Sequence, residues 1–150
     1  MWSVVDFGKF KGKGLSVPQI VFKDPDWFFW ATENNAFKGR QAIEAKDIAA
    51  KVRRIKINKP EPSDWKIEYL FLDGKFAQFS IVPEDRPAHV GSSIPMYDSQ
   101  LDFKIPRQAR NYDKLGYKHF LKTFRYHWFD DKNFTKERCE AFFDNDDNFV

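Results

Sequence analysis

The alternation of apolar and polar residues is clearest between residues 65 and 82, where two runs rich in aromatic and β-branched residues flank Asp73-Gly74. Within the first run, Ile67, Tyr69 and Phe71 alternate with Lys66, Glu68 and Leu70, which is the period expected of a half-buried strand. Asp-Gly is a favoured two-residue loop of a type I′ hairpin, because both of its residues need positive φ. The pattern predicts a β-hairpin over about residues 65–82, with Phe76 and Phe79 on opposite faces of its second strand.

Other stretches carry the spacing or the end signals of helices. Asp24-Pro25 begins a helix over about residues 25–33, because Asp supplies an N-cap oxygen and Pro fits the first turn. Three more helices are expected over residues 40–53, over much of 107–129 with a start near Asn111 or Asp113 and a softening at Gly116, and over 135–143 with Thr135 as the cap.

Shorter alternating runs complete the expected fold. Residues 54–59 and 101–105 each alternate as half-buried strands do, and the proline-rich residues 83–95 read as a loop. These elements predict an α+β fold, in which a small antiparallel sheet with the central hairpin packs against several helices. One domain over residues 1–150 is expected, with a candidate break near 59–63 that divides a basic module, 1–58, from the hairpin and C-terminal helices, 64–150.

Composition supports a folded chain and argues against two classes, disulfide-stabilised secreted scaffolds and membrane-spanning proteins. Aromatic residues make up 18% of the 150 residues, which is far above the content of a disordered chain. Cys139 is the single cysteine, so no intramolecular disulfide can form. No apolar run approaches the roughly 18 residues of a membrane span, and the first residues lack a charged-then-apolar signal region. A cytoplasmic protein without membrane partners is expected.

Positive charge is concentrated in the first 60 residues. They contain 12 Lys and Arg against 6 Asp and Glu, or +6, whereas the remaining 90 contain 13 against 16, or −3. Such a basic region attracts polyanions, although it also keeps ordinary proteins soluble.

The basic region begins with a stretch, residues 6–14, in which three glycines and three lysines are interleaved. Glycine permits positive φ or a close backbone approach, and in an extended segment Lys9, Lys11 and Lys13 share one face. A Gly-Lys hairpin is therefore expected at the amino terminus. The stretch lacks the length and the Ser or Thr of a Walker A loop, so no nucleoside triphosphate site is expected.

Together with Asp24, Pro25, Trp27 and Trp30, this stretch resembles a small module, FGK-x-KGK followed by DP-x-Y-x-x-W. The module is known from the carboxy terminus of exodeoxyribonuclease X-like proteins and from short proteins described as quorum-sensing-regulated virulence factors. The resemblance covers about residues 5–37, and the chain departs from the pattern where Trp27 replaces the usual Tyr and Gly14 the usual Thr or Pro. It implies an accessory module associated with nucleic acid rather than a catalytic one.

Two sets of residues are candidates for contact with nucleic acid. Phosphates are expected to bind the motif lysines and the densest basic cluster that follows them: Lys9, Lys11, Lys13, Lys51, Arg53, Arg54 and Lys56. Phe10 and Trp27 are candidates for stacking on bases. The alternative is that the lysines are simply solvated and that Trp27 and Trp30 belong to the core.

A second basic surface is expected on the helix within residues 107–129. Between residues 104 and 129 there are seven basic residues and one Asp, and Lys114, Lys118, Lys122 and Arg125 recur every three or four residues. Interleaved aromatic rings could stack on unpaired bases, and they are Tyr117, His119, Tyr126 and His127. The alternative is an amphipathic helix with a solvated basic face and an apolar side that includes Leu115.

The sequence contains no strong catalytic signature. HExxH, GxSxG and paired cysteines are absent, and Cys139 beside Glu140 is a poor candidate nucleophile. A metal-dependent nuclease built from Asp64, Glu68, Asp73 and Lys75 is an alternative, but the two residues Asp64 and Glu68 read as surface positions and Asp73 is explained by the turn. No catalytic residue, cofactor or metal ligand is therefore assigned.

Three functions remain open. The first is a non-catalytic nucleic-acid-binding protein, with DNA favoured, of bacterial or phage type and associated with DNA processing. The second is an interaction or inhibitor module that docks through aromatic residues and the acidic tail, Asp144 to Val150, which loosely resembles the partner-recruiting tails of single-strand-binding proteins. The resemblance is loose, and a frayed, solvated end is the expected state of that tail. The third is the metal-dependent nuclease.

Overall fold

The computed structural model describes residues 2–109 and 114–150, and it confirms the α+β fold class. Within these residues the strands form two antiparallel sheets, one in the order β1-β5 and one in the order β3-β2-β4. The helices are α1 (Val17–Lys23), α2 (Pro25–Glu33), α3 (Arg40–Lys51), α4 (Ile105–Ala109), α5 (Lys114–Phe129) and α6 (Lys136–Asp144). The strands are β1 (Ile55–Lys56), β2 (Trp65–Leu72), β3 (Lys75–Pro83), β4 (Ile94–Asp98) and β5 (Gln100–Leu101).

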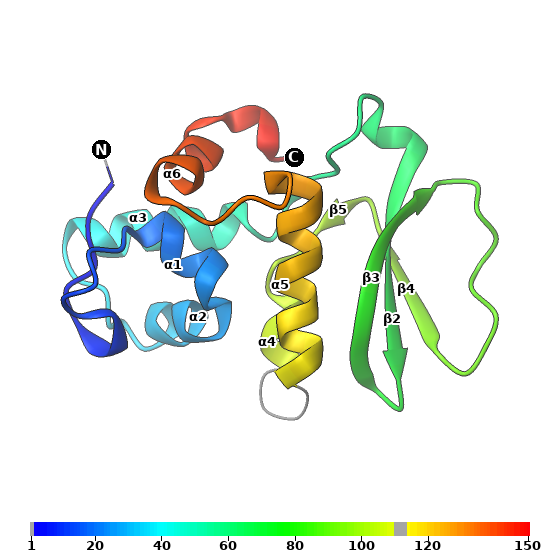
Figure 1. Ribbon diagram of the computed structural model, residues 1–150, viewed down its shortest axis with the longest axis horizontal. Coiled ribbons are helices and arrows are strands. Elements are labelled where there is room, and N and C mark those ends of the chain that lie inside the picture. Colours follow the sequence, from blue (N-terminus) through cyan, green and yellow to red (C-terminus); the bar gives the residue numbers. More distant parts are fainter. Residues whose placement is uncertain (1, 110–113) are drawn as a thin grey trace.

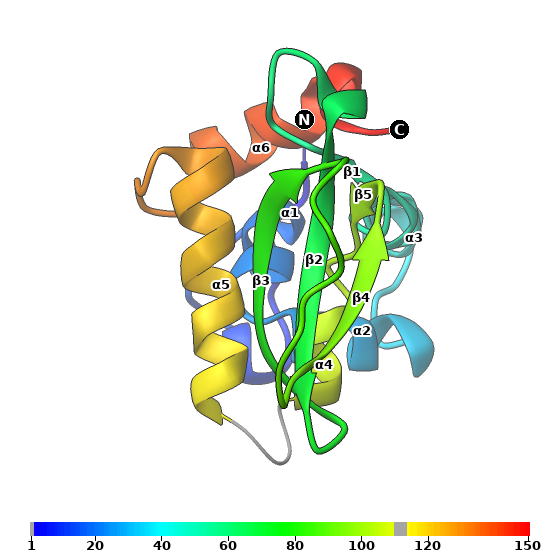
Figure 2. The same cartoon turned by 90° about the vertical axis from the view of Figure 1, so that its right-hand side faces the viewer.

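Helices α4 and α5 lie between the three-stranded sheet and the remaining helices (Figure 1). They cover one face of the sheet, and the loop of residues 84–93 crosses the other face (Figure 2). That loop is held by the backbone N–H of His89, which donates to the Tyr97 hydroxyl on β4. Because α5 lies between the sheet and the other helices, one of its sides faces the sheet and another faces α1 and α6.

The predicted hairpin is confirmed. Strands β2 and β3 pair from Trp65 opposite Pro83 to Leu72 opposite Lys75. Asp73 and Gly74 have φ values of 53° and 77°, which are the two positive angles that a type I′ turn requires. Local turn chemistry was therefore sufficient to place this element.

The predicted facing of Phe76 and Phe79 is wrong. A β-bulge shifts the register, because Leu70 pairs with Gln78 while Phe71 pairs with Phe76, which leaves Ala77 as the extra residue. Both phenylalanines consequently face α5. Their ring centroids lie 5.6 and 4.8 Å from that of Phe120.

The predicted third strand over residues 101–105 is also wrong beyond its first residue. Leu101 pairs with Ile55, and Lys56 pairs with Gln100, so that each strand of this sheet is two residues long. Asp102 then turns the chain, because its Oδ1 accepts from the backbone N–H of Lys104 at 2.9 Å. Helix α4 follows at once.

The predicted helices over 25–33, 40–53 and 135–143 agree with α2, α3 and α6 to within two residues. The predicted start near Asn111 or Asp113 lies outside the described residues. Gly116 is buried within α5. Leu115, expected on the apolar side of this helix, is 80% exposed.

Phe22 of α1 is at the centre of the core. Its ring centroid lies 5.0 to 5.5 Å from those of Phe103, Phe124, Phe129, Phe134, Phe142 and Phe143. All six follow the candidate break at residues 59–63, so the N-terminal helices share one core with the C-terminal half.

The C-terminal tail is attached to this core, and the expectation of a frayed, solvated end is wrong. Phe149 is 6% exposed, and its ring stacks on that of Phe143 at 5.7 Å. It forms an isolated antiparallel bridge with Ile55, and the backbone N–H of Val150 donates to the Arg54 carbonyl oxygen. The apolar Phe149 thus anchors an otherwise acidic segment.

Candidate functional site

The Gly-Lys stretch forms a compact loop rather than a hairpin of extended lysines. An antiparallel bridge between Val4 and Ser16 closes the loop, and Gly8–Phe10 is a short 3-10 helix. The period-two pattern therefore does not place Lys9, Lys11 and Lys13 along an extended strand, because the glycines at 8, 12 and 14 all take positive φ.

The two predicted stacking residues are used inside the protein. Phe10 is 7% exposed, and its ring lies edge-on to that of Trp27 with centroids 5.0 Å apart. Trp27 also contacts the rings of Phe7 and Phe37. A Cβ atom on Gly8 would lie 3.0 Å from Trp27, so the motif glycine lets the loop approach this ring. Phe10 and Trp27 thus form part of a packed aromatic cluster.

Of the three motif lysines, only Lys9 is paired within the described ranges. Its ammonium group forms an ion pair with Asp24. Lys11 and Lys13 are exposed.

The second predicted group lies at the far end of α3 and holds other parts of the chain. Lys51 pairs with Asp47 and Asp146, Arg53 pairs with Asp102, and Arg54 donates to the Val150 carbonyl oxygen, while the Lys56 backbone oxygen accepts from Trp128. The Gly-Lys loop packs near the start of this helix, where Gln41 donates to the Val4 carbonyl. A helix of this length spans about 18 Å, so the structure does not bring the two groups together.

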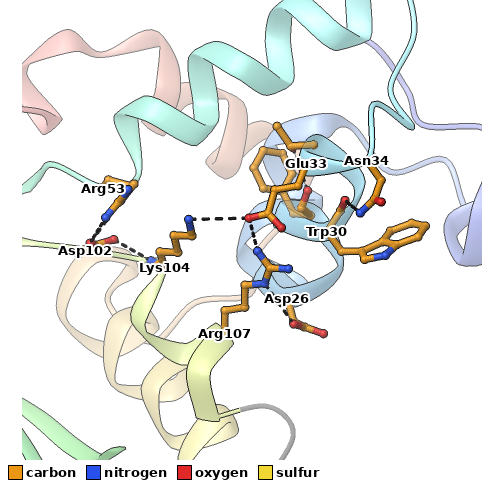
Figure 3. A network of polar contacts seen from close by, with 10 residues as sticks. Asp26, Trp30, Glu33, Asn34, Arg53, Asp102, Lys104 and Arg107 are labelled. Carbon is orange, nitrogen blue, oxygen red and sulfur yellow. Dashed lines mark hydrogen bonds and ion pairs between the residues drawn. The ribbon is translucent and has the colours of Figure 1, made fainter.

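Two further cations from the basic run that begins at residue 104 are neutralised between α2 and α4 (Figure 3). Arg107 forms ion pairs with Glu33 and Asp26, and Lys104 lies 3.8 Å from the Glu33 carboxylate. The hydrogen bond from Arg107 holds the pKa of Glu33 below its usual value. Among the described residues of this run, the cations without an ion pair are therefore Lys114, Lys118 and Lys122 of α5.

A groove runs along α5 on the side that faces α1 and the start of α6. It consists of three adjoining open hollows of about 380, 290 and 540 Å³, and neighbouring hollows share lining residues. We call it the α5 groove. The lining residues are Gln19, Lys23, Asp24, Lys114, Tyr117, Lys118, Leu121, Lys122, Arg125, Asn133, Phe134, Thr135 and Lys136.

The lining of the α5 groove is strongly basic. Among its described lining residues, six are cations and one is a carboxylate, Asp24. The cations are Lys23, Lys114, Lys118, Lys122, Arg125 and Lys136. Arg125 has its Nη2 3.2 Å from Asp131. Its Nε is buried and has no acceptor among the described residues.

Asp24 links the α5 groove to the Gly-Lys loop. Its carboxylate caps α2, accepts a 2.7 Å hydrogen bond from the Tyr117 hydroxyl, and pairs with Lys9. Burial alone would raise the pKa of Asp24, but the hydrogen bonds from Lys9, Tyr117 and the Trp27 N–H outweigh burial and lower it. Burial, reinforced by the Asp24 carboxylate, raises the pKa of Tyr117. Asp24 therefore stays ionised and internally satisfied.

Phe134 supplies an aromatic wall to two of the hollows, and the sequence analysis did not identify it. Its ring packs edge-on against Phe129 at 5.0 Å and remains partly exposed. The signal in the sequence was its place directly before the N-cap Thr135, where an apolar residue commonly packs on the helix that follows.

The alternative nuclease set is not assembled. Glu68, expected at the surface, is 3% exposed and accepts a 2.8 Å hydrogen bond from Tyr97. Asp64 and Asp73 flank opposite ends of β2, which puts them about 30 Å apart. Among the described residues, no three His, Cys, Asp or Glu side chains gather closely enough to hold a metal ion. Burial raises the pKa of Cys139 to about 12, so its thiol is not activated.

Comparison of the chain with models of known protein families, with curated proteins and with solved structures gave no match. Across the described ranges, none of the helices has the length and apolar character that crossing a membrane requires.

Proposed function

We propose that this protein binds nucleic acid without catalysing a reaction, and that it does so through the α5 groove. The observation that supports the proposal is the ratio of six cations to one internally paired carboxylate among the described residues that line a single groove. Ordinary surface helices alternate the two signs of charge, whereas a polyanion requires a continuous positive path.

The spacing of the cations suits a linear polyanion. Lys114, Lys118 and Lys122 follow one another every four residues, which is about 6 Å along the helix axis. The whole of α5 is about 24 Å long, which is enough for several successive phosphates. Each phosphate that a lysine neutralises releases bound counterions, so binding would weaken steeply as salt rises.

The Gly-Lys loop would extend this surface at one end. Lys9 reaches Asp24 at the margin of the α5 groove, and Lys11 and Lys13 point their charges into solvent from the same loop. The resemblance of residues 5–37 to an exodeoxyribonuclease X-like module supports DNA as the ligand and a role beside DNA-processing enzymes of bacteria or phages. Lys51, Arg53 and Arg54 would contribute mainly through folding, because each already holds an acidic group or the chain terminus.

The test is a double charge reversal in the α5 groove. We expect Lys118→Glu with Lys122→Glu to weaken binding of a labelled oligonucleotide at least tenfold and to reduce the salt slope by about 1.4 to 1.8, since two phosphate contacts are lost. Fluorescence anisotropy at two salt concentrations measures both quantities.

The matched control is Lys38→Glu with Lys46→Glu, which changes the net charge equally at exposed lysines outside the groove. An equal loss of affinity in both double variants would show that overall charge, not the α5 groove, causes binding. Absence of binding by the unmodified protein at low salt would refute the proposed function itself.

A further inference from the structure

We infer that the α5 groove takes single-stranded rather than duplex nucleic acid, and that Phe134 is the ring on which an unpaired base stacks. This inference rests on the proposed function and specifies its ligand. It concerns a residue that lies outside the Gly-Lys motif and outside α5.

Phe134 is held in position before any ligand arrives. Gln19 donates to its carbonyl oxygen, and Arg138 donates to the carbonyl oxygen of the preceding residue, Asn133. The ring packs on Phe22 and Phe129 of the core. A base that stacks on a ring fixed in this way does not have to overcome the entropy of ordering it.

The ring lies between cations. It lines one hollow together with Lys122 and the next together with Lys136, and Arg125 lines both. A nucleotide whose base stacks on Phe134 would have its two flanking phosphates within this set of positive charges. Alternation of aromatic faces and cations is the usual construction of surfaces that bind single strands.

A duplex could not use this arrangement. Its bases are paired and stacked inside the helix, so it presents phosphates and groove edges but no free base face. Phe134 is only partly exposed and lies within the hollows that the cationic side chains also line. The ring therefore adds binding energy for an unpaired base and none for a duplex.

The experiment compares single- and double-stranded oligonucleotides of the same sequence, titrated by fluorescence anisotropy. We expect the unmodified protein to prefer the single strand. Phe134→Leu keeps an apolar side chain in the core but removes the aromatic face. It should weaken single-strand binding about fivefold or more and leave duplex binding unchanged.

Tyr126→Leu is the matched control. Tyr126 is an aromatic residue of α5 that is 64% exposed and does not line the hollows of the α5 groove. We expect its replacement to leave both affinities unchanged. Near-ultraviolet circular dichroism of each variant verifies the fold.

Equal binding of the two forms, with no effect of Phe134→Leu, would overturn this inference while leaving the proposed function intact. If the unmodified protein binds neither the single strand nor the duplex, both this inference and the proposed function are overturned. If Phe134→Leu fails to fold, photo-crosslinking of the unmodified protein to a strand that carries 5-iodouracil decides the matter. A crosslink at Phe134 supports the inference, and crosslinks confined to other residues refute it.

Discussion

At the residue scale, Asp24 shows how one side chain can serve three elements. Its carboxylate caps the amino terminus of α2 through the Trp27 N–H, binds Lys9 of the Gly-Lys loop, and accepts from Tyr117 of α5. Local sequence required only the cap, because Asp before Pro is a common helix start. The other two contacts join segments up to 93 residues apart.

Replacing Asp24 by Asn tests this role. Asn retains a capping oxygen but loses the charge that attracts Lys9, so we expect a loss of about 1–2 kcal/mol in the free energy of unfolding at pH 7. The pKa of Asp24 is lowered by folding, so its contribution is present above the ordinary value of 3.8 and is lost as pH falls through the lower folded value. The difference between the two proteins should therefore shrink below pH 3.8, as measured by urea unfolding.

Asp47→Asn is the comparison for that measurement. The Asp47 carboxylate is 51% exposed and pairs with Lys51 at an i,i+4 spacing, so its removal should cost at most about 0.5 kcal/mol. If Asp24→Asn proves no more costly than Asp47→Asn, the carboxylate does not connect the three elements energetically.

At the element scale, the bulge in β3 determines which side chains the hairpin presents to α5. Ala77 is the extra residue, and it allows Phe76 and Phe79, three positions apart, to point to the same side. An unbroken strand would turn one of them toward the loop that crosses the other face. The hairpin and α5 consequently depend on each other for burial.

Deleting Ala77 should therefore be severely destabilising. Without the bulge, one of the two phenylalanines leaves the core, and the expected loss is about 3–5 kcal/mol, similar to that of a buried Phe replaced by Ala. Thermal unfolding followed by circular dichroism measures this effect. Ala77→Ser keeps the bulge at an exposed position and should change stability by less than about 0.5 kcal/mol. Equal stability of the deletion variant would mean that the bulge is not needed for packing.

At the scale of the whole molecule, the two sides of residues 59–63 are joined by backbone as well as by side chains. Strand β1 pairs with β5, and the backbone N–H of Phe103 donates to the Val52 carbonyl oxygen. Phe22, which precedes this segment, packs on Phe103 and Phe124, which follow it. The α5 groove is likewise lined from both sides, by Lys23 and by α5.

Separate chains of residues 1–58 and 64–150 should therefore not fold alone. Each would expose the phenylalanine side chains that the other covers. The free energy of burial lost in this way exceeds the few kcal/mol by which small domains are stable. We expect little cooperative thermal unfolding of either fragment, and recovery of the transition when the two are mixed. A sharp independent transition for residues 1–58 would instead establish a separate basic module.

The sequence by itself determined the elements whose signals are local. Each of these signals consists of residues within or next to the element that it specifies. They are the Asp73-Gly74 turn, the capped starts of α2 and α6, and the periodic pattern of α3. The basic character of α5 was also evident in its spacing. Each of these depends on backbone geometry or helix periodicity, which neighbouring residues set.

Only the tertiary structure decided how those elements use their side chains. The motif residues Phe10 and Trp27 pack on each other, Lys51 and Arg53 hold distant carboxylates, and Phe134 lines the α5 groove. A cation that is solvated, paired or available to a ligand has the same local sequence in each case. The difference lies in which distant residue comes within a few ångströms, and long-range packing of the chain determines this.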